Sequence, residues 1–240
     1  MGVTGLKIRD YMRKTWPVYI FVFLLAIAGT MATDNAITAI SEDAVLEGRH
    51  CVIIDAGHGG VDGGATSCTG VLESHINLEI AHKLNDLLIF MGYQTKMIRT
   101  EDVSIHTQGN TIAAQKLSDL KERARIAENT PLALYISIHQ NYFTQIQYSG
   151  TQVFYGAAEG SRELAAALQK SFVTALQPQN NRQCKQASGV YLMEHISCPA
   201  VLWECGFLSN PEEEVLLRDP CYQKKLCVVA ASCISKYLDP

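Results

Sequence analysis

The chain has 240 residues, of which 48% are hydrophobic, so it can bury a full core as one large domain or two small ones. Its formal charge of −4 at pH 7 gives no indication of nucleic-acid binding, for which a basic surface would be expected. Charge is uneven, because four basic side chains precede the first apolar stretch: Lys7, Arg9, Arg13 and Lys14.

Residues 16–32 form an uncharged and mostly apolar stretch directly after this basic region. As a hydrophobic helix it would span roughly 25 Å, barely the thickness of a bilayer core. Such a pattern is typical of a signal peptide or a short uncleaved membrane anchor, and we slightly favour the anchor. A buried helix of the domain is disfavoured by the flanking positive charge. We therefore predict a signal peptide or membrane anchor at 1–32, a linker at 33–49 and an extracytoplasmic domain at 50–240.

The rest of the chain alternates between strand and helix patterns. Apolar or alternating runs predict strands at 51–54, 93–99, 132–138, 150–155, 190–193 and 200–204. Helical spacing predicts helices at 73–91, 111–129, 161–176, 211–217 and 221–238, with Ser161 as an N-cap and 177–188 as a polar loop. Strands that alternate with helices indicate βαβ units, so we expect a single α/β domain with a mostly parallel sheet.

Four side chains suited to metal binding or proton transfer lie at the ends of these elements. His58 follows the first strand in a glycine-rich loop, Glu73 begins the first helix, and His139 and Glu204 end two further strands. Two histidines and a carboxylate are a common ligand set for catalytic zinc, with a fourth position left for water. Glu204 is then a candidate to take a proton from water and return it to a leaving amine. The pattern predicts one Zn²⁺ per chain at His58, Glu73 and His139.

The residues alone leave other interpretations open. The helix dipole favours a carboxylate such as Glu73 at a helix start without any metal. His139 after an apolar strand is also consistent with a hydrogen-bonded histidine, and Glu204 with a structural carboxylate. Asp55 and Asp62 are candidates either to orient a metal-bound histidine or to stabilise the turn.

Three further patterns suggest different sites. Glu79 and His82, one helical turn apart, have a spacing found in helical metal sites, with His75 on the same face. Cys205 is a conceivable nucleophile with His139 as its base. The glycine loop does not fit a phosphate site, because Asp62 stands where the third glycine belongs and no Lys-Ser/Thr follows.

All eight cysteines lie between residues 51 and 233, and several sit within apolar runs. Sequence cannot assign pairs among them. We interpret them mainly as small buried hydrophobic residues and expect few or no disulfides.

Four ordered motifs carry a family resemblance. They are IIDAGHGGVDGGA at 53–65, followed by Glu73, then SIHQN at 137–141 and WECGFLSNPEEE at 203–214, together with the landmarks Arg99–Asp102 and Arg123–Ala127. From about Cys51 to Tyr237 the chain resembles the zinc-dependent N-acetylmuramoyl-L-alanine amidases of the amidase-3 type.

The resemblance implies His58, Glu73 and His139 as zinc ligands and Glu204 as the catalytic glutamate. The implied substrate is peptidoglycan, cleaved at the amide between the lactyl group of N-acetylmuramic acid and the L-alanine of the stem peptide. The implied fold is a twisted, mainly parallel sheet of about six strands with helices on both faces. Residues 50–240 would then be the amidase catalytic domain.

Some features depart from the family pattern. Tyr142 and Phe143 stand where relatives commonly have a small residue after the asparagine, which bears on substrate preference, and Cys205 is less usual beside Glu204. The inhibitory helix of periplasmic division amidases has no counterpart, because Tyr155 leads through 156–160 into the next helix.

The arrangement of a hydrophobic segment and a catalytic domain without wall-binding repeats resembles that of sporulation amidases. These prepare the spore cortex for muramic-δ-lactam formation, and the resemblance implies an accessory lipoprotein as a partner. The expected location is the cell wall or the forespore intermembrane space, with a membrane contact if the N-terminal segment is uncleaved. The alternatives are a general amidase for cell separation or wall turnover, and a domain that binds peptidoglycan without cleaving it.

Overall fold

The computed structural model describes residues 50–239. The predicted signal peptide or anchor at 1–32 and the linker at 33–49 lie outside the described residues, so this division of the chain stays a prediction. Within 50–239, no helix combines the length and the apolar character that crossing a membrane requires.

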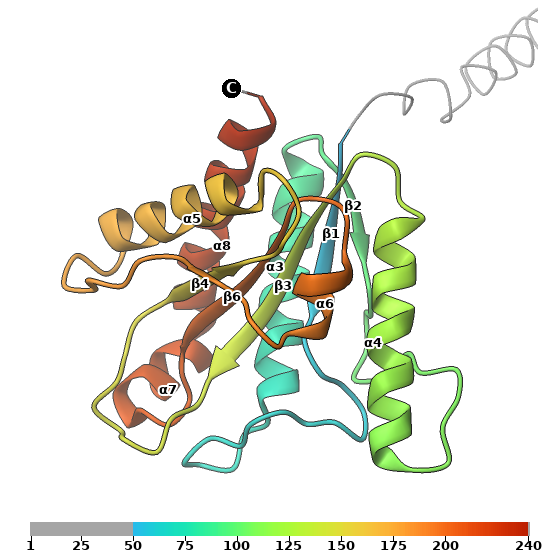
Figure 1. Cartoon of the computed structure of the whole chain (residues 1–240). Helices are drawn as coiled ribbons and strands as arrows, with labels where there is room; N and C mark the ends of the chain where they lie inside the picture. Colours follow the sequence, from blue (N-terminus) through green and yellow to red (C-terminus); the bar gives the residue numbers. More distant parts are fainter. Residues whose placement is uncertain (1–49, 240) are drawn as a thin grey trace, which may run out of the picture. The chain divides into compact units, whose positions relative to one another are not determined.

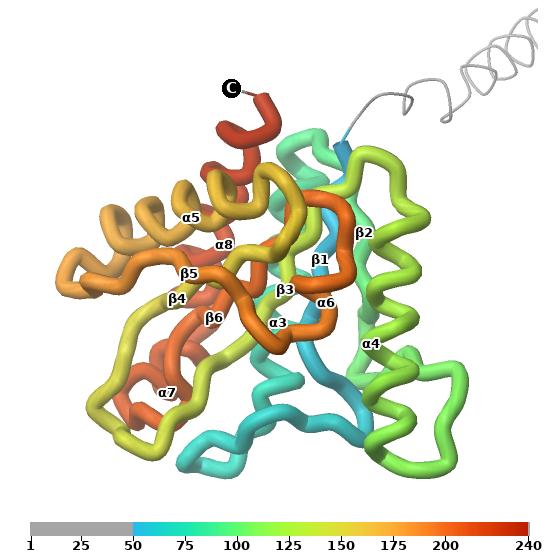
Figure 2. Tube along the Cα trace, viewed as in Figure 1, coloured from blue at the N-terminus to red at the C-terminus, as the bar shows by residue number. Residues whose placement is uncertain are grey.

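The described residues form a six-stranded sheet with helices (Figures 1 and 2). The strands are β1 (Cys51–Ala56), β2 (Gln94–Met97), β3 (Ala133–Asn141), β4 (Gln152–Tyr155), β5 (Lys185–Gln186) and β6 (Ala200–Phe207). The helices are α3 (Glu73–Phe90), α4 (Ile112–Glu128), α5 (Ser161–Ala175), α6 (Tyr191–His195), α7 (Pro211–Arg218) and α8 (Pro220–Leu238).

The strand order is β2-β1-β3-β6-β4-β5. Strands β2, β1, β3 and β6 are parallel, whereas β4 pairs antiparallel with β6 and parallel with β5. This confirms the predicted mostly parallel α/β sheet. The chain leaves β1 for β2 on one side and returns to β3 on the other, so the order reverses between β1 and β3. Open α/β sheets bind ligands at the carboxyl ends of the strands beside such a reversal.

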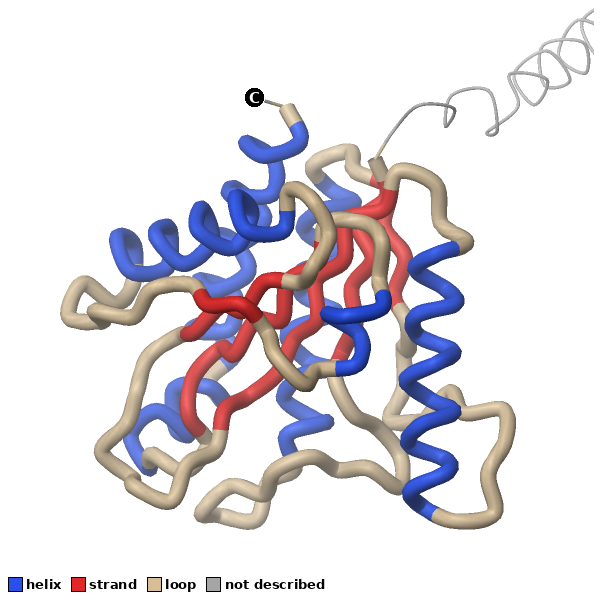
Figure 3. The backbone as a smooth tube through the Cα atoms, viewed as in Figure 1, coloured by secondary structure: helices blue, strands red, loops and turns tan. Residues whose placement is uncertain are grey.

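Alternating side chains build an apolar core on each face of the sheet. Val52 and Ile54 of β1 belong to a core that includes residues of α3, α5 and α8. Ile53 of β1 belongs to a second core with residues of α4 and α6. Figure 3 shows helices on both sides of the strands, which confirms the predicted layers. Strands buried on both faces read as continuous apolar runs, which explains why β1 and β3 were readable from sequence.

Three local predictions are wrong. The sequence predicts a strand at 190–193, but Val190 caps α6 and the next three residues lie within that helix. Leu192 and Met193 are buried in the core of the α4 face. Short apolar runs do not distinguish strand from helix. The expected loop at 177–188 contains the short strand β5. Ser161 is the first residue of α5 rather than its cap, and its buried Oγ accepts a hydrogen bond from the Ala200 N–H.

Candidate metal centre

Three of the predicted side chains meet at the carboxyl ends of β1 and β3. His58 follows β1, Glu73 is the first residue of α3, and His139 lies near the end of β3. His58 Nε2 is 3.3 Å from Glu73 Oε2, and His139 Nδ1 is 2.9 Å from Glu73 Oε1. One ligand atom from each lies within 4.8 Å of the others, and residues 50–239 hold no second group of this kind.

This donor set fits a zinc ion. Ligands at 2.0–2.1 Å in a tetrahedral shell stand roughly 3.3 Å apart, and each histidine nitrogen lies 2.9 to 3.3 Å from an oxygen of Glu73. Two imidazoles and one carboxylate also leave a fourth position open for water or substrate. A cavity of about 190 Å³ adjoins the cluster and is lined by both histidines together with Lys116, Leu120 and Leu192.

Glu204 lies directly beside His139 in the sheet. The two residues are register partners in the parallel pair of β3 and β6, so both side chains emerge on the α4 face. Trp203 and Cys205, on either side of Glu204, belong to the core of the opposite face. The sequence predicts that this strand ends at Glu204, and this bound is wrong, because β6 continues to Phe207.

The carboxyl group of Glu204 is poorly solvated. Its Oε2 is buried and has no hydrogen-bond partner among the described residues. Burial raises the pKa of Glu204 to about 7; the nearby charge of Glu73 acts in the same direction, while His139 and His58 oppose it. A carboxyl that titrates near neutrality is suited both to accept and to return a proton.

Glu73 is oriented by neighbours that the sequence analysis missed. Its Oε1 accepts hydrogen bonds from Asn77 Nδ2 at 3.3 Å and from the Gln140 N–H at 3.1 Å, and its Oε2 from the Ala65 N–H at 2.9 Å. Burial alone would raise the pKa of Glu73, but the hydrogen bonds and charge of His139 and His58 hold it well below its usual range. The available signal for Asn77 was its position one helical turn after Glu73.

His58 adopts an unusual backbone conformation, with φ of 61°. Its Nδ1 is 3.0 Å from Asp62 Oδ2, and Lys116 Nζ holds the other oxygen of Asp62 at 2.8 Å. Burial alone would lower the pKa of His58, but Glu73 and Asp62 raise it to about 9. Asp62 thus contacts the histidine, one of its two predicted roles, and also accepts a hydrogen bond from the Gly64 N–H within the turn. Asp55 does not contact the histidine, because its carboxylate accepts hydrogen bonds from Tyr135, Ser137 and Arg123.

Two buried arginines hold the backbone around His58. Arg99 donates to the carbonyl oxygens of Ala56, Gly57 and Ser74 at 2.8 to 3.1 Å. Arg123 donates to the carbonyl oxygens of Ala56 and His58 from the other side of the loop. The two arginine landmarks of the sequence therefore have a structural meaning, since they donate hydrogen bonds to buried backbone carbonyls around the loop.

Two glycines leave room for the cluster. A Cβ at Gly57 would lie 2.3 Å from the ring of His139, and a Cβ at Gly64 would lie 2.5 Å from Glu73 Oε2. Gly64 also has φ of +69°. The glycine-rich loop therefore allows close approach of the backbone to the cluster.

The competing sites are not assembled. His75 contacts Asp102, His82 Nε2 contacts the Thr100 carbonyl, and Glu79 accepts from Gln223, so no helical metal site forms. Cys205 is buried on the face opposite His139, and burial raises the pKa of its thiol well above the usual value. All eight cysteines are free thiols in the structure.

The fold and the site define an α/β protein in which two histidines and a carboxylate cluster at the strand ends beside a buried glutamate, an arrangement typical of metal-dependent hydrolases. Residues 52–236 match the family Amidase_3, N-acetylmuramoyl-L-alanine amidase. The chain belongs to this family of hydrolases.

Individual relatives agree with this assignment. The germination-specific N-acetylmuramoyl-L-alanine amidase of Bacillus subtilis (strain 168) is 35% identical over 176 residues, 73% of this chain and 74% of that protein. The CwlD amidase from Clostridioides difficile, solved in complex with the GerS lipoprotein, is 36% identical with a TM-score of 0.75 over 80% of this chain and 98% of that one. An N-acetylmuramoyl-L-alanine amidase from Clostridium difficile 630 is 31% identical with a TM-score of 0.70, over 80% and 97% respectively.

Proposed function

We propose that this protein cleaves the amide between N-acetylmuramic acid and the L-alanine of the stem peptide, with one Zn²⁺ per chain. His58, Glu73 and His139 would hold the ion, and Glu204 would transfer protons. The observation that carries the proposal is the convergence of the first three side chains at the carboxyl ends of the strands, with Glu204 beside His139 in the sheet. Family membership supports the same reaction.

The bound ion supplies Lewis acidity, which polarises the scissile carbonyl and makes a water molecule easier to deprotonate. Glu204 takes the proton from the attacking water through its unpartnered Oε2 and then delivers it to the leaving amine of L-alanine. Asp62 keeps the proton of His58 on Nδ1, so that Nε2 faces the cluster. Asn77 and the Gln140 N–H keep Glu73 in place.

The role of Glu204 is tested by Glu204→Gln, which keeps the size of the side chain and removes its basicity. We expect full zinc content by elemental analysis and a loss of hydrolysis of about 10²- to 10⁴-fold. Glu163→Gln, at an exposed position in the first turn of α5, serves as the matched control and should retain full activity. Undiminished hydrolysis by Glu204→Gln would contradict the assignment, and failure of a strong chelator to inhibit would contradict the metal mechanism. A domain that only binds peptidoglycan would show no hydrolysis in the wild type.

We further propose that the enzyme acts outside the cytoplasm on spore cortex, in the step that prepares muramic-δ-lactam, with an accessory lipoprotein as partner. The germination-specific amidase of Bacillus subtilis and the CwlD complex with the GerS lipoprotein support this role. The N-terminal hydrophobic segment would serve as the signal peptide or anchor. Spores from a deletion strain should lack muramic lactam by muropeptide analysis. Unchanged lactam would exclude the cortex role and leave cell separation or wall turnover.

A further inference from the structure

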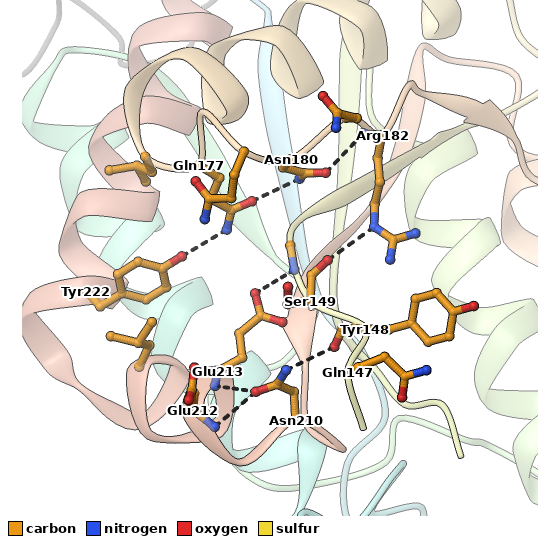
Figure 4. A pocket seen from close by; sticks show the side chains of 15 residues that line it. Gln147, Tyr148, Ser149, Gln177, Asn180, Arg182, Asn210, Glu212, Glu213 and Tyr222 are labelled. Atoms are coloured by element: carbon orange, nitrogen blue, oxygen red, sulfur yellow. Dashed lines mark hydrogen bonds between the residues drawn. The ribbon is translucent and has the colours of Figure 1, made fainter. Parts of the chain in front are cut away.

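A second cavity, of about 570 Å³, lies at the same end of the sheet as the metal centre. Its walls come from three segments: 147–150 before β4, 176–182 after α5, and 210–222, which covers α7 and the start of α8 (Figure 4). Nothing in the proposed chemistry uses this cavity. Its lining is rich in amide side chains, and its one cation is Arg182.

Arg182 is held flat by two aromatic rings. Its guanidinium carbon lies 4.9 Å from the ring centre of Phe207 and 5.8 Å from that of Tyr148, and these two rings stack on each other. Its Nε donates to the Ser149 carbonyl oxygen at 3.3 Å. Among the described residues, its two Nη groups have no hydrogen-bond partner, and no carboxylate forms an ion pair with it.

The support of this guanidinium is rigid before any ligand binds. Gln177 and Asn180 hold the backbone of Thr151, and Asn180 Oδ1 accepts from the Arg182 N–H. The Tyr148 carbonyl accepts a hydrogen bond from Asn210, which caps α7. A planar fork that is positioned by stacking, and whose two Nη groups remain free, matches a carboxylate bidentately at little entropic cost on binding.

The other charges of the cavity leave this role to Arg182. Glu213 is committed to the structure, because its two oxygens accept from the Gly150 and Phe207 N–H groups. Glu212 lies on the opposite side of the cavity from Arg182 in Figure 4. A carboxylate at Arg182 therefore need not contact either glutamate.

Strand β6 links the ring under Arg182 to the candidate site. Phe207 lies three residues beyond Glu204 on β6, a backbone path of roughly 10 Å at 3.3 Å per residue. An extended peptide covers that span with about three residues. We infer that this cavity is a subsite for the stem peptide, in which Arg182 binds a carboxylate about three residues from the scissile amide. The inference rests on the proposed amidase function, since it assumes that the amide lies beside Glu204.

The test compares two substrates: an N-acetylmuramoyl tripeptide with a free terminal carboxylate, and the same compound with that group as a carboxamide. We expect wild-type kcat/KM to be about tenfold higher for the free acid, mostly through KM, because the contact exists both before and during the reaction. Arg182→Gln should bring this ratio of kcat/KM values close to one, because it should lower kcat/KM for the free acid and leave that for the carboxamide unchanged. Arg182→Lys should keep part of it, since the charge remains while the fork is lost. Lys185→Gln removes an exposed cation from β5 nearby and should leave the ratio unchanged.

Thermal melting of each variant separates loss of the subsite from loss of the fold. An Arg182→Gln protein that melts like wild type and retains the full ratio overturns the inference. The free tripeptide, titrated into both proteins by calorimetry, tests the subsite independently of cleavage. If the free tripeptide binds Arg182→Gln more weakly than wild type, the subsite is supported, even if neither muramoyl compound is hydrolysed. Absence of hydrolysis would refute the amidase function and not the subsite. Equal binding of the tripeptide to both proteins overturns the subsite.

Discussion

Gly57→Ala should disable the metal centre while adding a single methyl group. The new Cβ would lie 2.3 Å from both Cε1 and Nε2 of His139. Carbon atoms pack at about 3.5 Å or more, so the ring would have to move by about 1 Å. It cannot turn freely, because its Nδ1 contacts Glu73 and its ring centre lies 4.9 Å from that of His58 in a T-shaped arrangement.

The expected magnitude follows from this displacement. Metal–ligand distances tolerate only about 0.2 Å, so a ring displaced by about 1 Å should weaken zinc binding and hydrolysis by at least 10- to 100-fold. Overpacking should also lower the free energy of unfolding by about 1–3 kcal/mol. Zinc affinity by competition with a chromophoric chelator, together with the hydrolysis rate, measures the effect.

Gly63→Ala is the matched control, in the same loop. There a Cβ would meet the ends of the Leu72 side chain at 3.0 Å or more, and that side chain can rotate away. The control should bind zinc and cleave substrate nearly as wild type does. If Gly57→Ala bound zinc with wild-type affinity, the proposed placement of His139 against this backbone would be wrong.

Three further predictions follow from contacts around the site. Asn77→Ala removes the side chain that joins Glu73 to Gln140 and should lower zinc affinity about tenfold or more in the same chelator assay; an unchanged affinity would show that Asn77 does not orient the carboxylate. Burial raises the pKa of Asp55, but Arg123 and the other partners of Asp55 outweigh this and lower it. Its stabilisation is therefore present above the unfolded-state pKa of about 4 and is lost as pH falls through the lower folded-state pKa. Asp55→Asn should lower the free energy of unfolding by about 3 kcal/mol at neutral pH. In urea unfolding at different pH values, its free energy of unfolding should fall less steeply toward acid pH than that of wild type. An equally steep fall would show that other carboxylates cause the acid dependence. Zinc at about 1,000 times its Kd should stabilise the protein by about 4 kcal/mol, and chelation should reverse the resulting rise in Tm; a Tm insensitive to both would argue against a zinc site.

The sequence by itself determined the layers of the fold, because strands buried on both faces must be continuous apolar runs. Residues 51–54 and 132–138 could be assigned on that basis. Residues 51–54 lie within β1, and 133–138 lie within β3. Short or polar elements carry no such pattern, which is why β5 and α6 were misassigned. Their conformation depends on contacts far away in the sequence, such as Leu192 and Met193 against the core of the α4 face.

The four residues of the candidate site were also readable, since they occupy the ends of recognisable elements and match a family pattern. Sequence alone left each of them open to a structural role that involves neither a metal ion nor a reaction. Tertiary structure decides that the four residues meet, because the order β2-β1-β3-β6 brings His58 and His139 together at Glu73 and sets Glu204 beside His139. The supporting shell of Asn77, Arg99 and Arg123 was decided in the same way. Hydrogen bonds to backbone carbonyls leave no trace in composition or periodicity, and a guanidinium stacked on Phe207 leaves none either.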